Sequence, residues 1–402
     1  MRMLIRMISV GFLLQISLLL PVRAAEVHTY WLNRSPEVRE AYQHFYDLDY
    51  PGAVARFERI RLAHPKDPVA DCYLLNAVVF QELFRQDLLD TTFYANDGFL
   101  TGKHPTPENN TVRDRIFGLA DGVVGEANER LKHNSNDEDA LFARGWARSL
   151  KATYIAMVER GFGTAFHLAL QAHGDHARLL EMDPQYVDAK LVVGVYQYTI
   201  GALPLGFKIM FGFAGMFGSK NKGLELLRDD AARGVLTSTE SRTVIALFER
   251  RESKYQDAIK VIRALKQQYP HDFLFALEEA NLLKDSGQGP VAIAAYRAVL
   301  ADAARPGFFP ASHDDLAWFG LADTLRGQTI YPEAAQAFER AATAPTVGAE
   351  LKRRSYLAAG QCWDTIGHRK EAVADYNLVL KSGESTVADQ ARKFLRTPYR
   401  SK

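Results

Sequence analysis

Cysteine is scarce in this chain of 402 residues, which contains only Cys72 and Cys362. The two lie near opposite ends of the sequence, and a disulfide needs Cα atoms within about 7 Å of each other. Both fall in apolar stretches with helical spacing. We therefore predict two buried free thiols rather than a bridge.

An excess of one charge is also lacking. The chain has 49 Lys and Arg residues against 48 Asp and Glu residues, whereas nucleic-acid binders usually carry a basic excess or stripe. We therefore predict no nucleic-acid partner. Hydrophobic residues make up 47% and charged residues 24%, a globular balance that excludes wholesale disorder.

Catalytic motifs are missing as well. The sequence has no Walker loop, no Gly-x-Ser-x-Gly elbow and no His-Glu-x-x-His. The strongest set of potential metal ligands is His167, His173, Asp175 and His176, of which His173 and His176 can share one helix face. Gly174 separates these two and no further ligand is evident. We predict no catalytic residue, no cofactor and no metal site, and a metal-dependent enzyme at His167, His173 and His176 is a minor alternative.

Adjacent carboxylates occur at Asp229–Asp230 and Asp314–Asp315. Neighbouring residues on a helix point in different directions, so neither pair can work on one substrate atom. We expect these four side chains to be solvated or to cap helices.

The first apolar run has the order of a secretory signal peptide. Arg2 and Arg6 precede the largely apolar residues 7–20, and small residues then occupy the positions that a signal peptidase reads. We predict cleavage of residues 1–24 after Ala24 and an exported, periplasmic or secreted protein. The alternative is a retained membrane anchor, although the run is shorter than the roughly 20 residues of a span.

The second apolar run covers residues 191–218 and contains six glycines, with Lys208 as its only charge. Three interpretations stay open: a buried hairpin inside an enlarged repeat, a hydrophobic partner-binding patch, or membrane insertion. Pro204, Lys208 and the glycines argue against insertion.

A fixed period organises the second half of the chain. Each unit reads as two helices, of which the second carries Ala-x-x-x-aromatic-x-x-apolar, and Ala258 to Ala292 spans 34 residues. Small residues such as Gly145, Gly194 and Gly360 recur in the first helices, where they allow two helix axes to approach. The two clearest units contain Trp318, Leu321, Ala322, Leu325, Tyr331, Ala334, Phe338 and Ala341, and then Tyr356, Gly360, Trp363, Gly367, Ala372, Tyr376 and Val379.

These units resemble the tetratricopeptide repeat (TPR) superfamily, as in exported bacterial TPR proteins. The resemblance is specific at residues 36–65 and 240–383, moderate over 138–235 and weak over 66–137. It implies an all-α fold, an α-solenoid of about eight stacked antiparallel helix pairs. Residues 187–265 also loosely resemble the eukaryotic inclusion-body-clearance group of TPR proteins, which implies a helical-repeat adaptor near membranes or lipid.

The predicted organisation follows from the repeats. Ser385 caps a closing amphipathic helix, and the basic tail after Pro398 is expected to fray. The divisions are a signal peptide at 1–24, an N-terminal TPR-like region at 25–137, enlarged repeats with the Gly-rich segment at 138–235, a C-terminal array with its capping helix at 236–396, and a tail at 397–402.

The first helix of each pair lines the concave side of TPR arrays, which gives a candidate partner-binding surface. Its expected exposed positions are Arg250, Asn281, Lys284, Phe319, Asp323, Arg326, Gln361 and Asp364. They do not reproduce the Lys-Asn-Asn-Lys-Arg clamp that some TPR domains use for a C-terminal carboxylate.

The predicted function is a non-catalytic protein–protein interaction scaffold outside the cytoplasm, with a protein or peptide ligand in the concave groove. The alternative is a membrane- or lipid-associated TPR protein that uses residues 199–217, with a peripheral membrane contact.

Overall fold

The computed structural model describes residues 26–94, 109–203, 217–383 and 385–400, and this part of the chain is helical with no β-strand. It contains seventeen α-helices. The predicted signal peptide and most of segment 199–217 lie outside the described residues.

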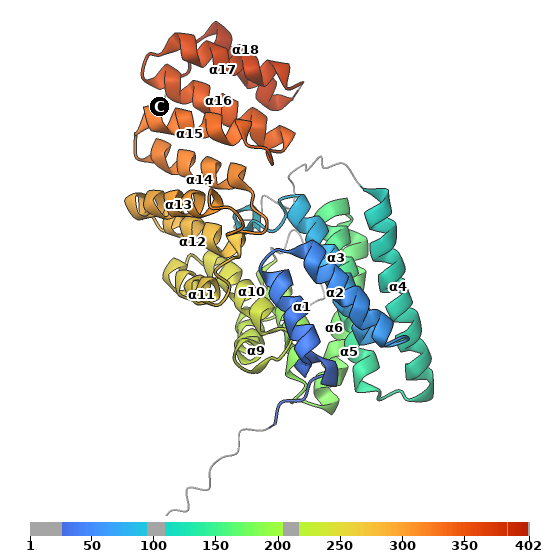
Figure 1. The fold of residues 1–402 in the computed structure, drawn as a ribbon. Coiled ribbons are helices and arrows are strands. Elements are labelled where there is room, and N and C mark those ends of the chain that lie inside the picture. Colours follow the sequence, from blue (N-terminus) through green and yellow to red (C-terminus); the bar gives the residue numbers. More distant parts are fainter. Residues whose placement is uncertain (1–25, 95–108, 204–216, 384, 401–402) are drawn as a thin grey trace, which may run out of the picture.

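Sixteen of the helices form eight antiparallel hairpins, as predicted, and the last helix closes the array (Figure 1). The hairpins are α1 (Pro36–Tyr46) with α2 (Tyr50–Ala63), α3 (Pro68–Arg85) with α4 (Asn110–His133), α5 (Glu138–Tyr154) with α6 (Phe162–Met182), α7 (Lys190–Ala202) with α9 (Lys220–Arg233), α10 (Ser238–Arg251) with α11 (Tyr255–Gln268), α12 (Phe273–Asp285) with α13 (Gly289–Ala303), α14 (Asp314–Gly327) with α15 (Tyr331–Thr343), and α16 (Ala349–Thr365) with α17 (Arg369–Lys381). The closing helix is α18 (Thr386–Arg396).

Local sequence sets where these helices begin and turn. The Ser35 hydroxyl accepts a hydrogen bond from the Val38 N–H at 3.1 Å, which satisfies a free donor of the first turn of α1. Gly287 and Gly367 follow α12 and α16 with φ of 78° and 82°, a left-handed conformation that glycine adopts without a steric penalty. These turns reverse the chain tightly enough for the two helices of a hairpin to pack.

Small residues mark the helix crossings, as the repeat pattern predicts. A Cβ placed on Gly145 would lie 2.3 Å from the His176 ring, and one on Gly360 would lie 2.6 Å from the Tyr376 ring. Ala372 is fully buried. In these two hairpins an aromatic ring of the second helix thus occupies the space that the glycine leaves.

The N-terminal hairpins form one arm and the C-terminal repeats form another, and the chain brings the two into contact (Figure 1). The Tyr46 hydroxyl on α1 donates to the Glu240 carboxylate on α10 at 2.6 Å. The Tyr46 ring also lies 4.8 Å from the Tyr269 ring, centroid to centroid. We call residues 36–94 the N-terminal arm and residues 238–400 the C-terminal array.

The segment before α1 adds a second long-range tie. The His28 N–H donates to the Gln185 carbonyl at 2.9 Å. The buried Asp188 carboxylate accepts from the Thr29 hydroxyl and from the N–H groups of Val235 and Leu236. One carboxylate therefore joins three stretches of chain.

The core is continuous along the array. One cluster of buried side chains runs from Tyr30 to Ala391, and a smaller one surrounds the stacked rings of Tyr198 and Phe248. Cys72 and Cys362 are buried and free, which confirms the prediction. The predicted divisions after residues 137 and 235 fall between helices, at the starts of α5 and α10, and as domain boundaries they stay a prediction.

Two expectations are wrong. The tail does not fray directly after Pro398, because the Tyr399 N–H donates to the Asp364 carboxylate at 2.8 Å and its ring packs on Phe394. Asp230 and Asp315 are not solvated, since both are fully buried. Tertiary packing around the helix ends covers them, and no local pattern announces that packing.

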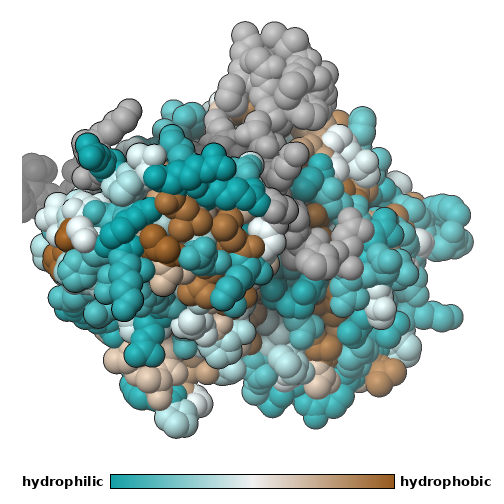
Figure 2. Space-filling view, turned by 90° about the horizontal axis from the view of Figure 1, so that it is seen from above, coloured by the Kyte–Doolittle hydropathy of each residue, from teal (hydrophilic) through white to brown (hydrophobic). Residues whose placement is uncertain are grey.

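The last repeat is covered by α18. The Ser385 hydroxyl accepts from the Ala388 N–H at 3.1 Å, and Val387, Ala388 and Ala391 are buried. Seen from above, the molecule presents mostly hydrophilic residues, with one larger apolar area and several smaller ones between them (Figure 2). Among the described helices, none combines the length and the apolar character that crossing a bilayer requires.

Candidate functional site

Three of the eight predicted partner-binding residues are held by the chain itself. Arg250 on α10 is 2% exposed. Its guanidinium donates to Asp285 at 2.5 Å, to Glu278 at 3.1 Å and to the Thr91 hydroxyl at 2.6 Å. A partner would have to displace the Thr91 segment to reach this side chain.

The electrostatics around Arg250 are those of a buried ion pair. Burial alone would lower the pKa of Arg250, but Glu278 and Asp285 outweigh it and the pKa is raised. Burial raises the pKa of Glu278 to about 7, although Arg250 opposes this. The cluster is a structural tie between the N-terminal arm and the C-terminal array, because breaking a buried pair leaves an uncompensated charge.

Asn281 and Asp364 also form hydrogen bonds with other parts of the chain. The Asn281 amide donates to Asp90 at 3.3 Å, and its carbonyl accepts from the Tyr296 hydroxyl at 2.6 Å. Asp364 accepts from the Tyr376 hydroxyl at 3.0 Å and from the tail.

The other predicted positions form a half-buried strip on α12, α14 and α16, which we call the concave strip. Lys284 and Arg326 lie 3.8 Å and 2.6 Å from Asp323, measured from nitrogen to oxygen. The Arg354 guanidinium, which was not predicted, lies over the Phe319 ring at 5.2 Å. The strip consists of Lys284, Phe319, Asp323, Arg326, Arg354 and Gln361.

The concave strip carries more positive than negative charge. Lys284 and Arg326 pair with Asp323, and Arg354 lies over the Phe319 ring. Asp285 lies 3.9 Å from Lys284 but is held more closely by Arg250. An apolar ring beside uncompensated cations can contact a peptide that has both an apolar and an acidic side chain. Partner binding by the predicted residues stays a prediction.

The predicted histidine group is not assembled as a metal site in the described residues. His176 is 1% exposed, stacks on Phe142 and lies 3.0 Å from the Phe142 carbonyl. The His173 ring packs on Tyr196 with centroids 4.0 Å apart. Burial lowers the pKa of both imidazoles, which fits neutral packing residues.

The structure instead gathers a group that sequence reasoning missed, namely Asp87, His313 and Asp315. Asp87 lies in the N-terminal arm and the other two in the C-terminal array, so no spacing motif could have connected them. Only the adjacency of His313 to the Asp314–Asp315 pair was visible in the sequence.

An apolar cavity of about 170 Å³ lies between the arm and the array. Its walls include Phe45, Tyr50, Leu89, Leu274 and Leu277. The lining also includes the carboxylates of Asp90, Glu240, Asp272 and Glu278.

The comparisons agree with the repeat geometry. Residues 277–347, which cover α13, α14 and α15, match the family model of the tetratricopeptide repeat. Residues 277–347 therefore contain tetratricopeptide repeats (TPR). The match includes Ala292 and Ala334, which mark the second helices of two successive units.

Two solved structures resemble this TPR chain at low identity. The yeast Tom70 crystal structure is 12% identical, with 90% of this chain and 87% of that chain covered and a TM-score of 0.39. A tetratricopeptide repeat protein from Parabacteroides merdae is 13% identical, with 80% and 97% covered and a TM-score of 0.35. No curated protein sequence matches the chain. At these scores neither likeness bears on the partners of this TPR protein.

Proposed function

We propose that this TPR protein is a non-catalytic interaction scaffold that holds a peptide segment of another protein along the concave strip. The observation that carries the proposal is the strip itself, a half-exposed row across three first helices whose side chains are only partly paired with one another. The rest of the predicted concave residues are closed off by residues 87–94 and by the tail.

The chemistry of the strip defines the partner. Lys284, Arg326 and Arg354 favour carboxylates, and Phe319 offers an apolar contact. The partner segment is therefore acidic and contains at least one large apolar residue.

The place of action is outside the cytoplasm. This rests on the basic start, the apolar run and the small-residue site before Ala25. N-terminal sequencing of the chain from cells should find Ala25 first, and an intact Met1 on a cytoplasmic chain would contradict export.

Photo-crosslinking in the producing cell tests the scaffold proposal. A benzophenone amino acid at Phe319 should yield a discrete crosslinked product, because that ring lies within the strip. The matched control places the same group at Val291, which is 49% exposed on the outer helix α13. Equal products from the two positions, or none from Phe319, would contradict the proposal.

The lipid-associated alternative depends on residues 199–217, most of which lie outside the described residues. Phe217 at its end is 87% exposed. This alternative stays a prediction.

A further inference from the structure

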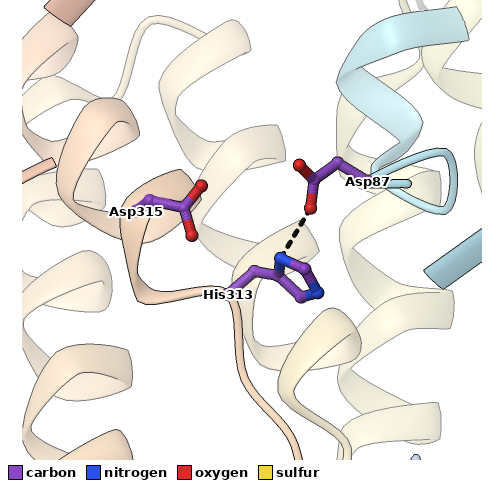
Figure 3. Close-up of side chains that lie close together, drawn as sticks. All are labelled: Asp87, His313 and Asp315. Carbon is purple, nitrogen blue, oxygen red and sulfur yellow. Dashed lines mark ion pairs between the residues drawn. The ribbon is translucent and has the colours of Figure 1, made fainter. Parts of the chain in front are cut away.

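Asp87, His313 and Asp315 meet where the N-terminal arm touches the C-terminal array (Figure 3). Asp87 follows α3 with φ of 58°, and the other two lie at the start of α14. In the part of the chain that the structure describes, this is the one group of three possible metal-ligating side chains whose ligand atoms all lie within 4.8 Å of one another. We call these three residues the clasp cluster.

Three polar atoms of the clasp cluster lack a hydrogen bond of acceptable geometry. His313 Nδ1 and Asp87 Oδ1 lie 2.6 Å apart as an ion pair, yet neither atom makes a hydrogen bond of acceptable geometry. Asp315 is fully buried and its Oδ2 is also unpaired. Buried polar atoms are nearly always satisfied, so three unsatisfied atoms converging on one point indicate a missing partner.

The rest of the environment orients these atoms and, among the described residues, pairs no Lys or Arg with them. The Thr346 hydroxyl donates to Asp315 Oδ1, which orients the carboxylate. Asp314 adds a further acidic side chain, and in the described part of the chain no Lys or Arg forms an ion pair with any of the three aspartates. One imidazole does not balance this charge, so the missing partner is a cation.

We propose that the clasp cluster binds one divalent transition-metal ion of the Zn²⁺ class. One imidazole nitrogen and two carboxylate oxygens are a ligand set that Zn²⁺ accepts. Bond lengths of about 2.0–2.2 Å place tetrahedral ligand atoms about 3.4 Å apart. The distance between His313 Nδ1 and Asp87 Oδ1, 2.6 Å, therefore has to lengthen by about 0.8 Å, and no separation among the ligand atoms has to shorten by more than about 1.4 Å.

The ion acts as a clasp between the two parts of the molecule. Two ligands come from α14 and one from the loop after α3, so binding fixes the arm against the array. A cavity of about 610 Å³ is lined in part by His313 and Thr346. This inference is independent of the scaffold function.

The test uses the untagged mature chain after removal of metal with EDTA. Titration with Zn²⁺ by calorimetry should show one site per chain, and saturating Zn²⁺ should raise the melting temperature. His313→Gln and Asp315→Asn should each weaken this binding tenfold or more and abolish the shift. If either of these variants fails to fold, Asp87→Asn supplies the test, because Asp87 is half-exposed. It should also weaken Zn²⁺ binding tenfold or more and abolish the shift in melting temperature.

Asp314→Asn is the matched control, because it removes the same charge one residue from a ligand. Its affinity for Zn²⁺ should stay within about threefold of the parent chain. Absence of a one-to-one site in the parent, retention of the site in all three ligand variants, or an equal loss in Asp314→Asn would overturn the proposal.

Discussion

Buried carboxylates are the main electrostatic feature at the scale of single residues. Burial raises the pKa of Asp230, Asp272 and Asp375 to about 8 each. Asp230 lies beside Asp229, whose pKa is lowered to about 2, chiefly by the hydrogen bond from Arg233. Two adjacent aspartates thus have opposite shifts, because one faces the core and the other faces cations.

The pH dependence of stability should follow from this pair. Between about pH 4 and pH 8 Asp230 is ionised in the unfolded chain but still protonated in the fold, so the free energy of unfolding falls as pH rises. The slope from one such group is at most about 1.4 kcal/mol per pH unit. Asp230→Asn, which keeps a neutral side chain, should flatten the urea-unfolding profile over this range.

Asp229→Asn is the control for that profile. Asp229 stabilises the fold above its ordinary pKa and loses this effect as pH falls through about 2, so its variant should differ from the parent chain mainly above pH 4, by a constant amount. If Asp230→Asn leaves the slope between pH 4 and pH 8 unchanged, Asp230 is not protonated in the fold.

The burial of some side chains could be predicted from the sequence, and the burial of others could not. The burial of Ala334, Ala372 and both cysteines follows from helical spacing alone. The burial of Arg250 and Asp315 does not, because each contacts a residue distant in the sequence, Thr91 and Thr346 respectively. The burial of Asp230 depends on the turn that brings Thr237 and Ser241 onto its carboxylate. From the sequence alone, a charged residue on a helix is expected to be solvated, because the segment that buries it cannot be identified.

At the scale of helices, the crossings of the hairpins carry the stability. Ala372 on α17 is fully buried in the last hairpin, where Gly360 meets the Tyr376 ring. A larger side chain there forces α16 and α17 apart, and overpacking costs about 1–3 kcal/mol. Ala372→Leu should therefore lower the melting temperature by several degrees in a thermal scan followed by circular dichroism.

Ala374→Leu supplies the control on the same helix. Ala374 is exposed, so the added side chain meets solvent and the melt should stay close to that of the parent chain. Equal melts for the two variants would show that Ala372 does not lie at a close helix contact.

The helices themselves were predictable because period, caps and turn glycines agree. The pairing of hairpins along the chain also follows, since each hairpin can bury its apolar face only against the next. The weakly patterned residues 66–137 nevertheless form the hairpin of α3 and α4, in which Asp67 and Asn109 cap the helices. Tertiary packing there replaces the repeat signature.

At the scale of the whole molecule, the decisive contacts join the arm to the array. Arg250 and Thr91 are 159 positions apart, and Asn281 and Asp90 are 191 apart. No local pattern encodes such contacts, so the sequence suggested an open concave surface where the structure shows one that is partly closed. The concave strip is the part of that surface that stays accessible.

The measurement that tests the central claim most directly is binding of two labelled peptides by fluorescence anisotropy. Both have one length and one aromatic residue, and they differ only in carrying Glu or Lys at the other positions. The mature chain should bind the acidic peptide at least tenfold more tightly. The double variant Arg326→Glu, Arg354→Glu should reverse that preference, while Arg297→Glu on the outer helix α13 should not change it. Equal binding of both peptides by the parent chain, or a reversal in the outer-helix variant, would contradict a concave strip that selects acidic segments.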